Sequence, residues 1–284
     1  MELSISIVSY NTKDSLKECL SSLVRHIQDI EYEIIVVDNS SCDGSPDMIK
    51  QEFPNVRLIE NNKNAFFTKA NNQAIRISKG QYILLLNSDT MVIDNSIQTM
   101  LNFMSHHPSA GAVSGKILFP DGRLQSIGWN FHTPLNVILN QDPIKKIFIK
   151  KYLSRLITHN SSSITEVDVV SDGFMLLRRE AIFGIGLYDE RFLLYYTEDD
   201  LCRRLKTKGW KVYYLPPASV IHKLFGSTKK GANIKIAGIR AIDTIRYFAK
   251  YYKFHIDLGI GFLLLFGLGI EISKVIIKRI KCLA

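Results

Sequence analysis

The sequence predicts an α/β fold with a mainly parallel central sheet. Apolar runs that are bounded by turn-forming residues are typical of strands covered on both faces, as strands in parallel sheets are. Ligands of such sheets bind at the carboxyl ends of the strands, so polar residues that follow the strands should share one edge. Three runs end in this way: 3–9 (LSISIVS) before Tyr10 and Asn11, 33–37 (EIIVV) before Asp38, Asn39 and Ser40, and 82–86 (YILLL) before Asn87, Ser88 and Asp89.

Helical patterns connect these strands. Apolar residues between 16 and 27 repeat at helical spacing, and Ser15 with Glu18 forms a capping-box pattern that predicts the start of the helix. A strand, a helix and a strand in succession imply a right-handed crossover and a parallel pair. The later elements are a strand at 56–59, helices at 64–78 and 93–106, a strand at 112–118 with a hairpin turn at 120–122, strand-like sequence at 167–178, a helix at 198–208 and a strand at 211–215.

Length and composition bound the class of protein. A chain of 284 residues can bury a sizeable core in one large domain. The net charge of +9 favours anionic partners, which include nucleic acid, an acidic membrane leaflet and phosphorylated substrates. The sequence contains no nucleic-acid recognition module, so nucleic acid is not expected as a partner. Four cysteines without CxxC spacing, and a first strand without an apolar leader, predict a reduced protein in the cytoplasm.

Two segments suggest a membrane surface. Residues 131–163 interleave lysines and arginines with apolar residues, which is typical either of a solvated helix face or of a helix on an anionic membrane. In the tail, residues 258–270 are thirteen uncharged residues followed by a basic end, which is short of the roughly 20 apolar residues that a spanning helix needs. We therefore expect residues 226–284 to form a helical tail associated peripherally with the membrane. The alternatives are a tilted span, or a helix that packs on the domain or on a second copy in a homodimer.

Asp89 is the strongest candidate for a metal ligand. A carboxylate at a strand end can hold Mg²⁺ or Mn²⁺ while substrate phosphates fill other coordination positions. Asp38 and Asn11 should lie on the same edge and offer hydrogen bonds to a nucleotide base and ribose, with Tyr10 available for stacking. His222 follows an apolar run at 218–221 and is a candidate to complete the metal site, although a lone histidine is more often structural.

A second cluster places Glu198, Asp199 and Asp200 in succession at a predicted helix start. Acidic residues stabilise a helix amino terminus, but three exceed what capping requires. Crowded carboxylates raise one another's proton affinity, so one of them can serve as a general base. The sequence lacks the motifs of several other enzyme classes: no GxGxxG follows the first strand, and neither a GxxxxGK[ST] loop nor an HExxH pair occurs.

The ordered motifs resemble the family 2 inverting glycosyltransferases, in particular their bacterial rhamnosyltransferase-like branch. The resemblance runs from about residue 3 to 223 and is specific as an ordered set. Its parts are VSYN ending at Asn11, VVDNSS (36–41), Asn64 and Phe67 with ANN (70–72), LLLNSDT (84–90), GFMLLRRE (173–180), YDERF (188–192), EDDLCRRL (198–205) and Ile221 with His222.

The resemblance implies a GT-A-type nucleotide-sugar-binding domain over residues 1–225, with a nucleotide-binding half at 1–110 and an acceptor and catalytic half at 111–225. Asp89 would be the metal-binding residue of a DxD-like motif, with His222 as a further ligand, and Glu198 or Asp199 would be the base. The residues expected at the donor are Ser9, Tyr10, Asn11, Asp38, Asn64, Asn71, Asn87, Ser88 and Asp89.

The chain departs from the family pattern at three points. Asn87 stands where a DxD motif begins with Asp, and Phe66 stands where many relatives have Gly. Relatives often read Glu-Asp-x-Asp-Leu, and alignment on Leu201 places Glu198 at the position of the catalytic Asp, with Asp199 one step away. Glu198 is therefore the favoured base, and Asp199 stays open as the alternative.

The activity implied is transfer of a sugar, with rhamnose as one candidate, from a nucleoside-diphosphate sugar to a hydroxyl of a glycan. One base suffices for a single, inverting displacement, and the sequence indicates no separate carboxylate nucleophile. The acceptor expected is a lipid-linked oligosaccharide on the cytoplasmic leaflet, in bacterial surface polysaccharide synthesis. A rival hypothesis is a non-catalytic nucleotide-sugar-binding or scaffold protein.

Overall fold

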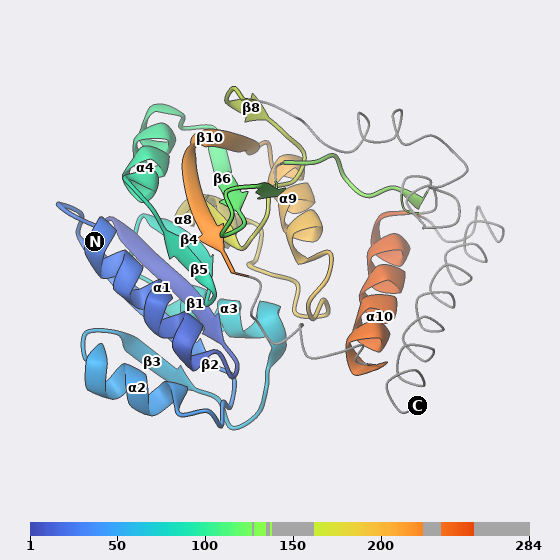
Figure 1. Cartoon of the computed structure of the whole chain (residues 1–284). Helices are drawn as coiled ribbons and strands as arrows, with labels where there is room; N and C mark the ends of the chain where they lie inside the picture. Colours follow the sequence, from blue (N-terminus) through green and yellow to red (C-terminus); the bar gives the residue numbers. More distant parts are fainter. Residues whose placement is uncertain (127, 135–136, 138–161, 224–233, 253–284) are drawn as a thin grey trace.

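The computed structural model describes residues 1–126, 128–134, 137, 162–223 and 234–252, and it is built around one large sheet (Figure 1). The strands follow the order β3-β2-β1-β4-β9-β6-β10-β5, with β7 paired to β6 and β8 paired to β10. Their bounds are β1 (Leu3–Ser9), β2 (Tyr32–Asp38), β3 (Arg57–Glu60), β4 (Tyr82–Asn87), β5 (Thr90–Val92), β6 (Ala110–Leu118), β7 (Leu124–Ser126), β8 (Thr165–Glu166), β9 (Phe174–Arg178) and β10 (Lys211–His222).

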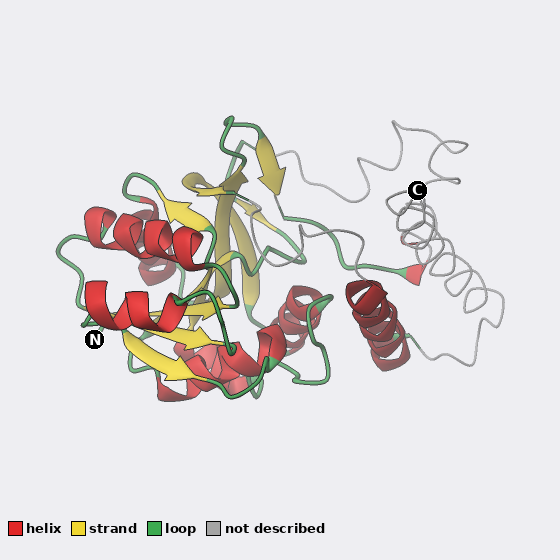
Figure 2. Ribbon diagram, turned by 60° about the horizontal axis from the view of Figure 1, so that its bottom comes forward, coloured by secondary structure: helices red, strands yellow, loops and turns green. Residues whose placement is uncertain are grey.

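Helices cover both faces of this sheet (Figure 2). Alternate residues of β4 point to opposite sides: Leu84 and Leu86 pack with α1, α2 and α4, whereas Ile83 and Leu85 pack with α3, α8 and α9. A strand buried on both faces needs a continuous apolar run, which explains the composition of β4. The helices are α1 (Lys13–His26), α2 (Ser45–Glu52), α3 (Phe66–Ile77), α4 (Ser96–His106), α8 (Arg179–Gly184), α9 (Thr197–Thr207) and α10 (Ile234–Tyr251).

The sheet is mixed, which corrects the prediction of a mainly parallel sheet. Strands β3, β2, β1 and β4 are parallel to one another, as expected. However, β9 runs antiparallel to both of its neighbours, β4 and β6, and β5 runs antiparallel to β10. The core strand β9 is as apolar as a buried parallel strand, so its composition does not reveal its direction.

Several element boundaries also differ from the predictions. Helix α1 begins at Lys13 with Thr12 as its N-cap and no side-chain capping bond, so the capping box at Ser15 was wrong. Strand β10 continues through Pro216 and Pro217 instead of ending at 215, because a register shift between Tyr214 and Ser219 absorbs the missing N–H donors. The predicted turn at 120–122 is confirmed, since β6 and β7 pair as an antiparallel hairpin.

The predicted tail is described only in part. Within it, residues 234–251 form helix α10, which packs through Tyr247 and Phe248 against Phe192. Most of the basic segment 131–163 and the apolar run 258–270 lie outside the described residues. Among the described helices, none combines the length and the apolar composition needed to cross a bilayer, and the described part of the tail gives the membrane-leaning prediction no support. The domain boundary at 225 stays a prediction.

Candidate active site

The predicted convergence of polar clusters at one sheet edge is present in the structure. Ser9, the last residue of β1, lies opposite Asp38, the last residue of β2, and Val8 lies opposite Asn87 at the end of β4. A chain of hydroxyl groups joins the ends of β1 and β4: the Thr12 hydroxyl lies 3.1 Å from Ser9 Oγ and donates to Ser88 Oγ at 3.0 Å. The end of β2 is joined to β1 by the Asn39 N–H, which donates to the Ser9 carbonyl at 2.8 Å. The three strand ends are therefore held as one polar platform.

Asp38 carries an unsatisfied oxygen on this platform. Its side chain is buried, and Oδ1 accepts the backbone N–H of Ser41 at 2.8 Å. Oδ2 is also buried but has no hydrogen-bond partner among the described residues. A buried polar atom without a partner is costly, and each such atom in a native structure calls for an explanation. A ligand that donates a hydrogen bond to Oδ2 supplies one.

Asn11 and Tyr10 border the same platform. Asn11 adopts a left-handed backbone conformation with φ of 54°, and its Oδ1 accepts the N–H of Cys42 at 2.8 Å. This contact ties the loop after β2 to the end of β1, so Asn11 has a structural role in addition to the predicted one. The Tyr10 side chain is exposed and available to a ligand.

The two other asparagines predicted at the donor make contacts within the protein. Asn64 Oδ1 accepts the N–H of Phe66 at 2.8 Å at the start of α3, where Phe66 itself has φ of 61°. That backbone conformation favours glycine, which agrees with the glycine that the family resemblance implies at this position. Asn71 is buried, accepts from Ser6 Oγ at 2.9 Å and donates to the Phe67 carbonyl. Contacts of Asn64 and Asn71 with a donor stay predictions.

The two predicted metal ligands lie side by side. Asp89 follows β4, His222 ends β10, and the antiparallel pairing of β5 with β10 brings them together. His222 Nε2 is 2.9 Å from Asp89 Oδ1, and its Nδ1 is 2.9 Å from Gln125 Oε1. A partner on the far ring nitrogen orients a histidine in the way that metal sites commonly require.

The donor set at this pair fits a cation that is shared with a substrate. It offers one carboxylate and one imidazole, and among the described residues no group of three or more His, Cys, Asp or Glu side chains forms a closed metal site. Mg²⁺ and Mn²⁺ commonly take one or two protein ligands together with phosphate oxygens and water. The arrangement therefore suits a cation that binds together with a diphosphate.

A second carboxylate accompanies Glu198, and the sequence did not indicate it. The Thr197 hydroxyl lies 2.8 Å from Asp172 Oδ2 and 2.9 Å from Glu198 Oε2, and the Tyr188 hydroxyl donates to the same Asp172 oxygen at 3.2 Å. A hydroxyl has one proton, so Thr197 can donate fully to only one of the two carboxylates. The other contact is satisfied when its carboxyl group is protonated and donates to Thr197.

The electrostatics agree with a shared proton. Burial raises the pKa of Asp172 to about 6, against the lowering effect of its hydrogen bonds from Thr197 and Tyr188. Burial, followed by the negative charges of Asp172 and Asp199, raises the pKa of Glu198 well above its usual range. A carboxyl group with an elevated pKa is a stronger base, which is what proton abstraction near neutral pH requires.

The other two acidic residues are engaged elsewhere. Asp199 is buried, and its Oδ1 lies 2.8 Å from His132 Nδ1 and accepts the His132 backbone N–H at 3.2 Å. Asp200 accepts from Arg204 at 2.8 Å and from Tyr251 at 2.6 Å. Of the three carboxylates, Glu198 is the one held beside Asp172, which agrees with the preference for Glu198 as the base.

Asp172 also links the two predicted clusters. The Asn87 N–H donates to the Gly173 carbonyl at 3.1 Å, and a Cβ on Gly173 would lie only 2.9 Å from Asn87 Nδ2. Because β9 is antiparallel to β4, its first residues lie beside the last residues of β4. Asp172 therefore lies at the same sheet edge as Asp89. This position could be recognised only once the direction of β9 was known.

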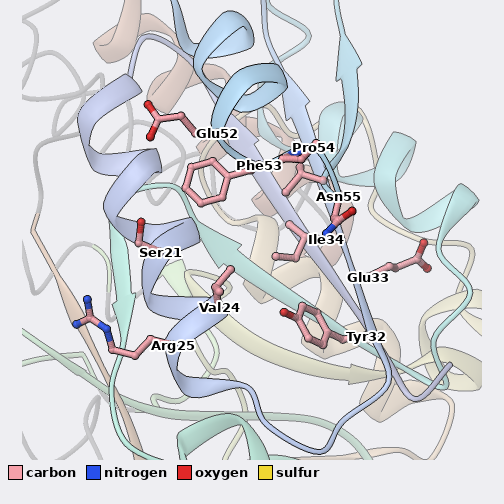
Figure 3. Close-up of a pocket in the computed structure, with 11 residues that line it drawn as sticks. Ser21, Val24, Arg25, Tyr32, Glu33, Ile34, Glu52, Phe53, Pro54 and Asn55 are labelled. Atoms are coloured by element: carbon pink, nitrogen blue, oxygen red, sulfur yellow. The ribbon is translucent and has the colours of Figure 1, made fainter.

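One groove lies away from this edge. It has a volume of about 780 Å³ and is bordered by α1, the start of β2 and the connection from α2 to β3 (Figure 3). Tyr32 and Ile34 on its wall belong to the amino end of β2, whereas Asp38 belongs to the carboxyl end. None of the predicted site residues lines this groove.

Comparison with known proteins agrees with this geometry. The model of the family described as "Glycosyl transferase family 2" matches residues 4–183. The chain belongs to this family. It is a glycosyltransferase, and it is similar to N-acetylglucosaminyl-diphospho-decaprenol L-rhamnosyltransferase of Mycobacterium tuberculosis, at 28% identity over 245 residues that cover 80% of this chain and 77% of the relative. A poly(ribitol-phosphate) beta-glucosyltransferase of Bacillus spizizenii is 38% identical over 128 residues, or 43% of this chain and 20% of that protein.

Solved structures confirm the GT-A-like fold. GalNAc-T7, solved with UDP, GalNAc and Mn²⁺, superposes with a TM-score of 0.62 at 15% identity and covers 86% of this chain, which spans 48% of that one. The mannosyltransferase PcManGT of Pyrobaculum calidifontis, in complex with GDP-Man and Mn²⁺, gives a TM-score of 0.59 at 15% identity over 96% of this chain and 74% of that one.

Proposed function

We propose that this glycosyltransferase moves a sugar from a nucleoside-diphosphate sugar to a glycan hydroxyl in a single, inverting displacement. The observation that carries the proposal is that the Asp172–Thr197–Glu198 cluster reaches the same sheet edge as the Asp89–His222 pair. A carboxylate of raised proton affinity thus stands near a pair suited to a diphosphate-bound cation. These are the two components that base-assisted transfer from such a donor requires.

The donor would lie across the platform formed by the strand ends. Asp38 Oδ2 accepts a hydrogen bond from the base or the ribose, and the exposed Tyr10 ring stacks on the base. Asp89 and His222 would hold a divalent cation, either Mg²⁺ or Mn²⁺, as structural neighbours with Mn²⁺ suggest. When bound, this cation supplies positive charge to the departing diphosphate.

Glu198 then removes the proton of the attacking hydroxyl. Its Oε atoms accept that proton as the acceptor oxygen approaches the anomeric carbon from the face opposite the diphosphate. Asp172 acts with Glu198 because the two carboxyl groups share the Thr197 hydroxyl. Asp172 Oδ2 accepts from Tyr188 and contacts the Thr197 hydroxyl, and in this proposal Asp172 supports the base and does not act as a nucleophile.

The acceptor we propose is a lipid-linked glycan at the cytoplasmic face of a bacterial membrane, with peripheral association of the enzyme. The name of the mycobacterial relative combines L-rhamnose with a diphospho-decaprenol, which supports a rhamnosyl donor and such an acceptor. A net charge of +9 suits both an anionic leaflet and a diphosphate lipid. Assembly into a homodimer belongs to the same proposal and is read out by light scattering.

The test is turnover of a panel of UDP-, GDP- and dTDP-sugars with and without Mn²⁺, measured by release of the nucleotide. We expect slow donor hydrolysis for a matching sugar, its abolition by EDTA and its recovery on adding Mn²⁺. Donor binding without turnover, in the presence of lipid-linked acceptor, would favour the non-catalytic alternative. No binding of any nucleotide would refute the proposal.

A further inference from the structure

Helix α10 lies outside the segment that matches the family, yet it holds the loop that leads into α9 (Figure 1). Asp243, in the middle of α10, is fully buried. Its carboxylate accepts three consecutive backbone N–H groups: Leu193 at 3.0 Å, Leu194 at 2.9 Å and Tyr195 at 3.1 Å. Successive N–H groups that converge in this way form an anion-binding nest, and here the anion comes from the chain itself.

The following turn of the chain is constrained on the same side. Tyr196 adopts φ of 59°, a conformation that non-glycine residues adopt only when their surroundings impose it. Its ring stacks on Tyr247 of α10 with centroids 4.7 Å apart and planes inclined by 20°. The nest and the stack together therefore fix the turn from which α9 begins.

Contacts with α10 continue into the acidic cluster. The Tyr247 hydroxyl lies 3.5 Å from Asp199 Oδ1, and Asp200 Oδ1 is bound by Tyr251 at 2.6 Å and by Lys250. Glu198 lies between the Tyr196 turn and these anchored residues, and of the three it is the one that shares the Thr197 hydroxyl with Asp172. The direction in which Glu198 points is therefore set by what holds the residues on either side of it.

We infer that Asp243 is a positioning residue for the general base: it fixes the backbone of residues 193–195 and, through the Tyr196 turn, keeps Glu198 beside Asp172. This inference rests on the proposed function, because it assigns Asp243 a part in proton removal. Buried carboxylates are costly unless they are well bonded, and the three charge-assisted bonds explain why Asp243 is tolerated at this position. The polar platform of strand ends makes none of these contacts, although the Phe67 N–H at the start of α3 donates to the Leu193 carbonyl at 3.1 Å. We therefore expect kcat to depend on Asp243 much more than donor binding does.

The experiment compares Asp243→Asn with Ile242→Ala, a neighbouring change on the exposed face of the same helix. We expect D243N to lower kcat at least tenfold while KM for the donor stays within twofold, and I242A to match wild type in both. The acid limb of the kcat profile should move to lower pH in D243N, because Glu198 leaves its buried position beside Asp172, where burial and then the neighbouring carboxylates raise its pKa. The titratable groups around Glu198 are Asp172, Tyr188, Tyr196, Asp199 and Cys202, with His132 against Asp199.

A double variant separates positioning from a general structural role. If Asp243 acts through Glu198, then D243N adds no further loss of kcat in the E198Q background, whereas independent effects multiply. Should D243N fail to fold, D243E keeps the charge, displaces the carboxylate by one methylene, and is expected to show the same selective loss of kcat.

Wild-type kcat and an unshifted pH profile in folded D243N or D243E would overturn the inference. So would a loss that multiplies fully with E198Q. Absence of transfer in both wild type and I242A would instead count against the proposed function. The two failures can thus be told apart.

Discussion

The amide substitution Glu198→Gln is the sharpest probe of the acidic cluster, with Asp199→Asn as its matched neighbour. Gln keeps the shape and the contact with Thr197 but cannot accept a proton. Loss of a general base costs roughly 10²- to 10⁴-fold in rate. We therefore expect kcat of E198Q to fall by that factor, which corresponds to about 3–5 kcal/mol of barrier.

We expect D199N, and not E198Q, to lower the free energy of unfolding. Burial, followed by the charges of Asp172 and Asp199, raises the pKa of Glu198, so its neutral amide should not destabilise the fold near neutral pH. Asp199 is buried against the backbone and ring of His132, so D199N loses a charged acceptor and should cost about 1–3 kcal/mol. Each kcal/mol lowers Tm by roughly 2–4 °C in a domain near this size.

Three measurements on the two variants check this reasoning. Nucleotide release at saturating donor gives kcat, calorimetric titration gives donor affinity, and differential scanning fluorimetry gives Tm. We expect E198Q to bind donor like wild type with a Tm that is equal or higher, and D199N to have a lower Tm. If E198Q retains more than about a tenth of wild-type turnover while D199N loses turnover at unchanged Tm, the assignment of the base to Glu198 is refuted and moves to Asp199.

Three further predictions concern the pair, the cation and the sheet. The pKa of Asp172 is raised from 3.8 to about 6, so its contribution to stability is fully present below pH 3.8 and is lost as pH rises through about 6. D172N should therefore be more stable than wild type at pH 7.5, by at most about 3 kcal/mol. Urea unfolding should show that this gain shrinks toward pH 4. A gain independent of pH would contradict this. His222→Ala should raise the Mn²⁺ concentration for half-maximal activity by about tenfold or more, and an unchanged Mn²⁺ titration would remove His222 from the metal site. Gly115→Ala places a Cβ 2.3 Å from the Ala218 carbonyl oxygen and should lower the free energy of unfolding in urea by about 1–3 kcal/mol. Gly184→Ala meets nothing within 4 Å and should leave it unchanged. Equal stabilities of the two variants would contradict the close approach of β6 to β10.

The parallel half of the fold and its polar edge were predictable from sequence. Strand β4 is apolar throughout and stops at a polar cluster, and the same pattern at the ends of β1 and β2 implied one shared edge. In the structure, the register of β1 and β2 places Ser9 opposite Asp38 at this edge. The residues alone offered His222 as one candidate to join Asp89 at a metal site, and the family resemblance favoured it. The strand that brings the two together, β5, is too short for its pattern to be recognised.

The features that escaped prediction depend on contacts between distant segments. Asp172 before a glycine has the character of a turn residue until the antiparallel direction of β9 is known. The separate roles of Glu198 and Asp199 are set by Thr197 on one side and by His132 with α10 on the other. Local sequence patterns indicate secondary structure and burial, but they do not say which side chain of an acidic cluster shares a hydrogen-bond partner with Asp172.

Proton NMR of the glycoside formed by the wild-type enzyme from a donor of known anomeric configuration tests the central claim most directly. One displacement assisted by Glu198 predicts a product of inverted configuration at the anomeric carbon from the first turnovers. A product with retained configuration would require a carboxylate nucleophile, for which Asp172 is the nearest candidate, and would contradict the mechanism.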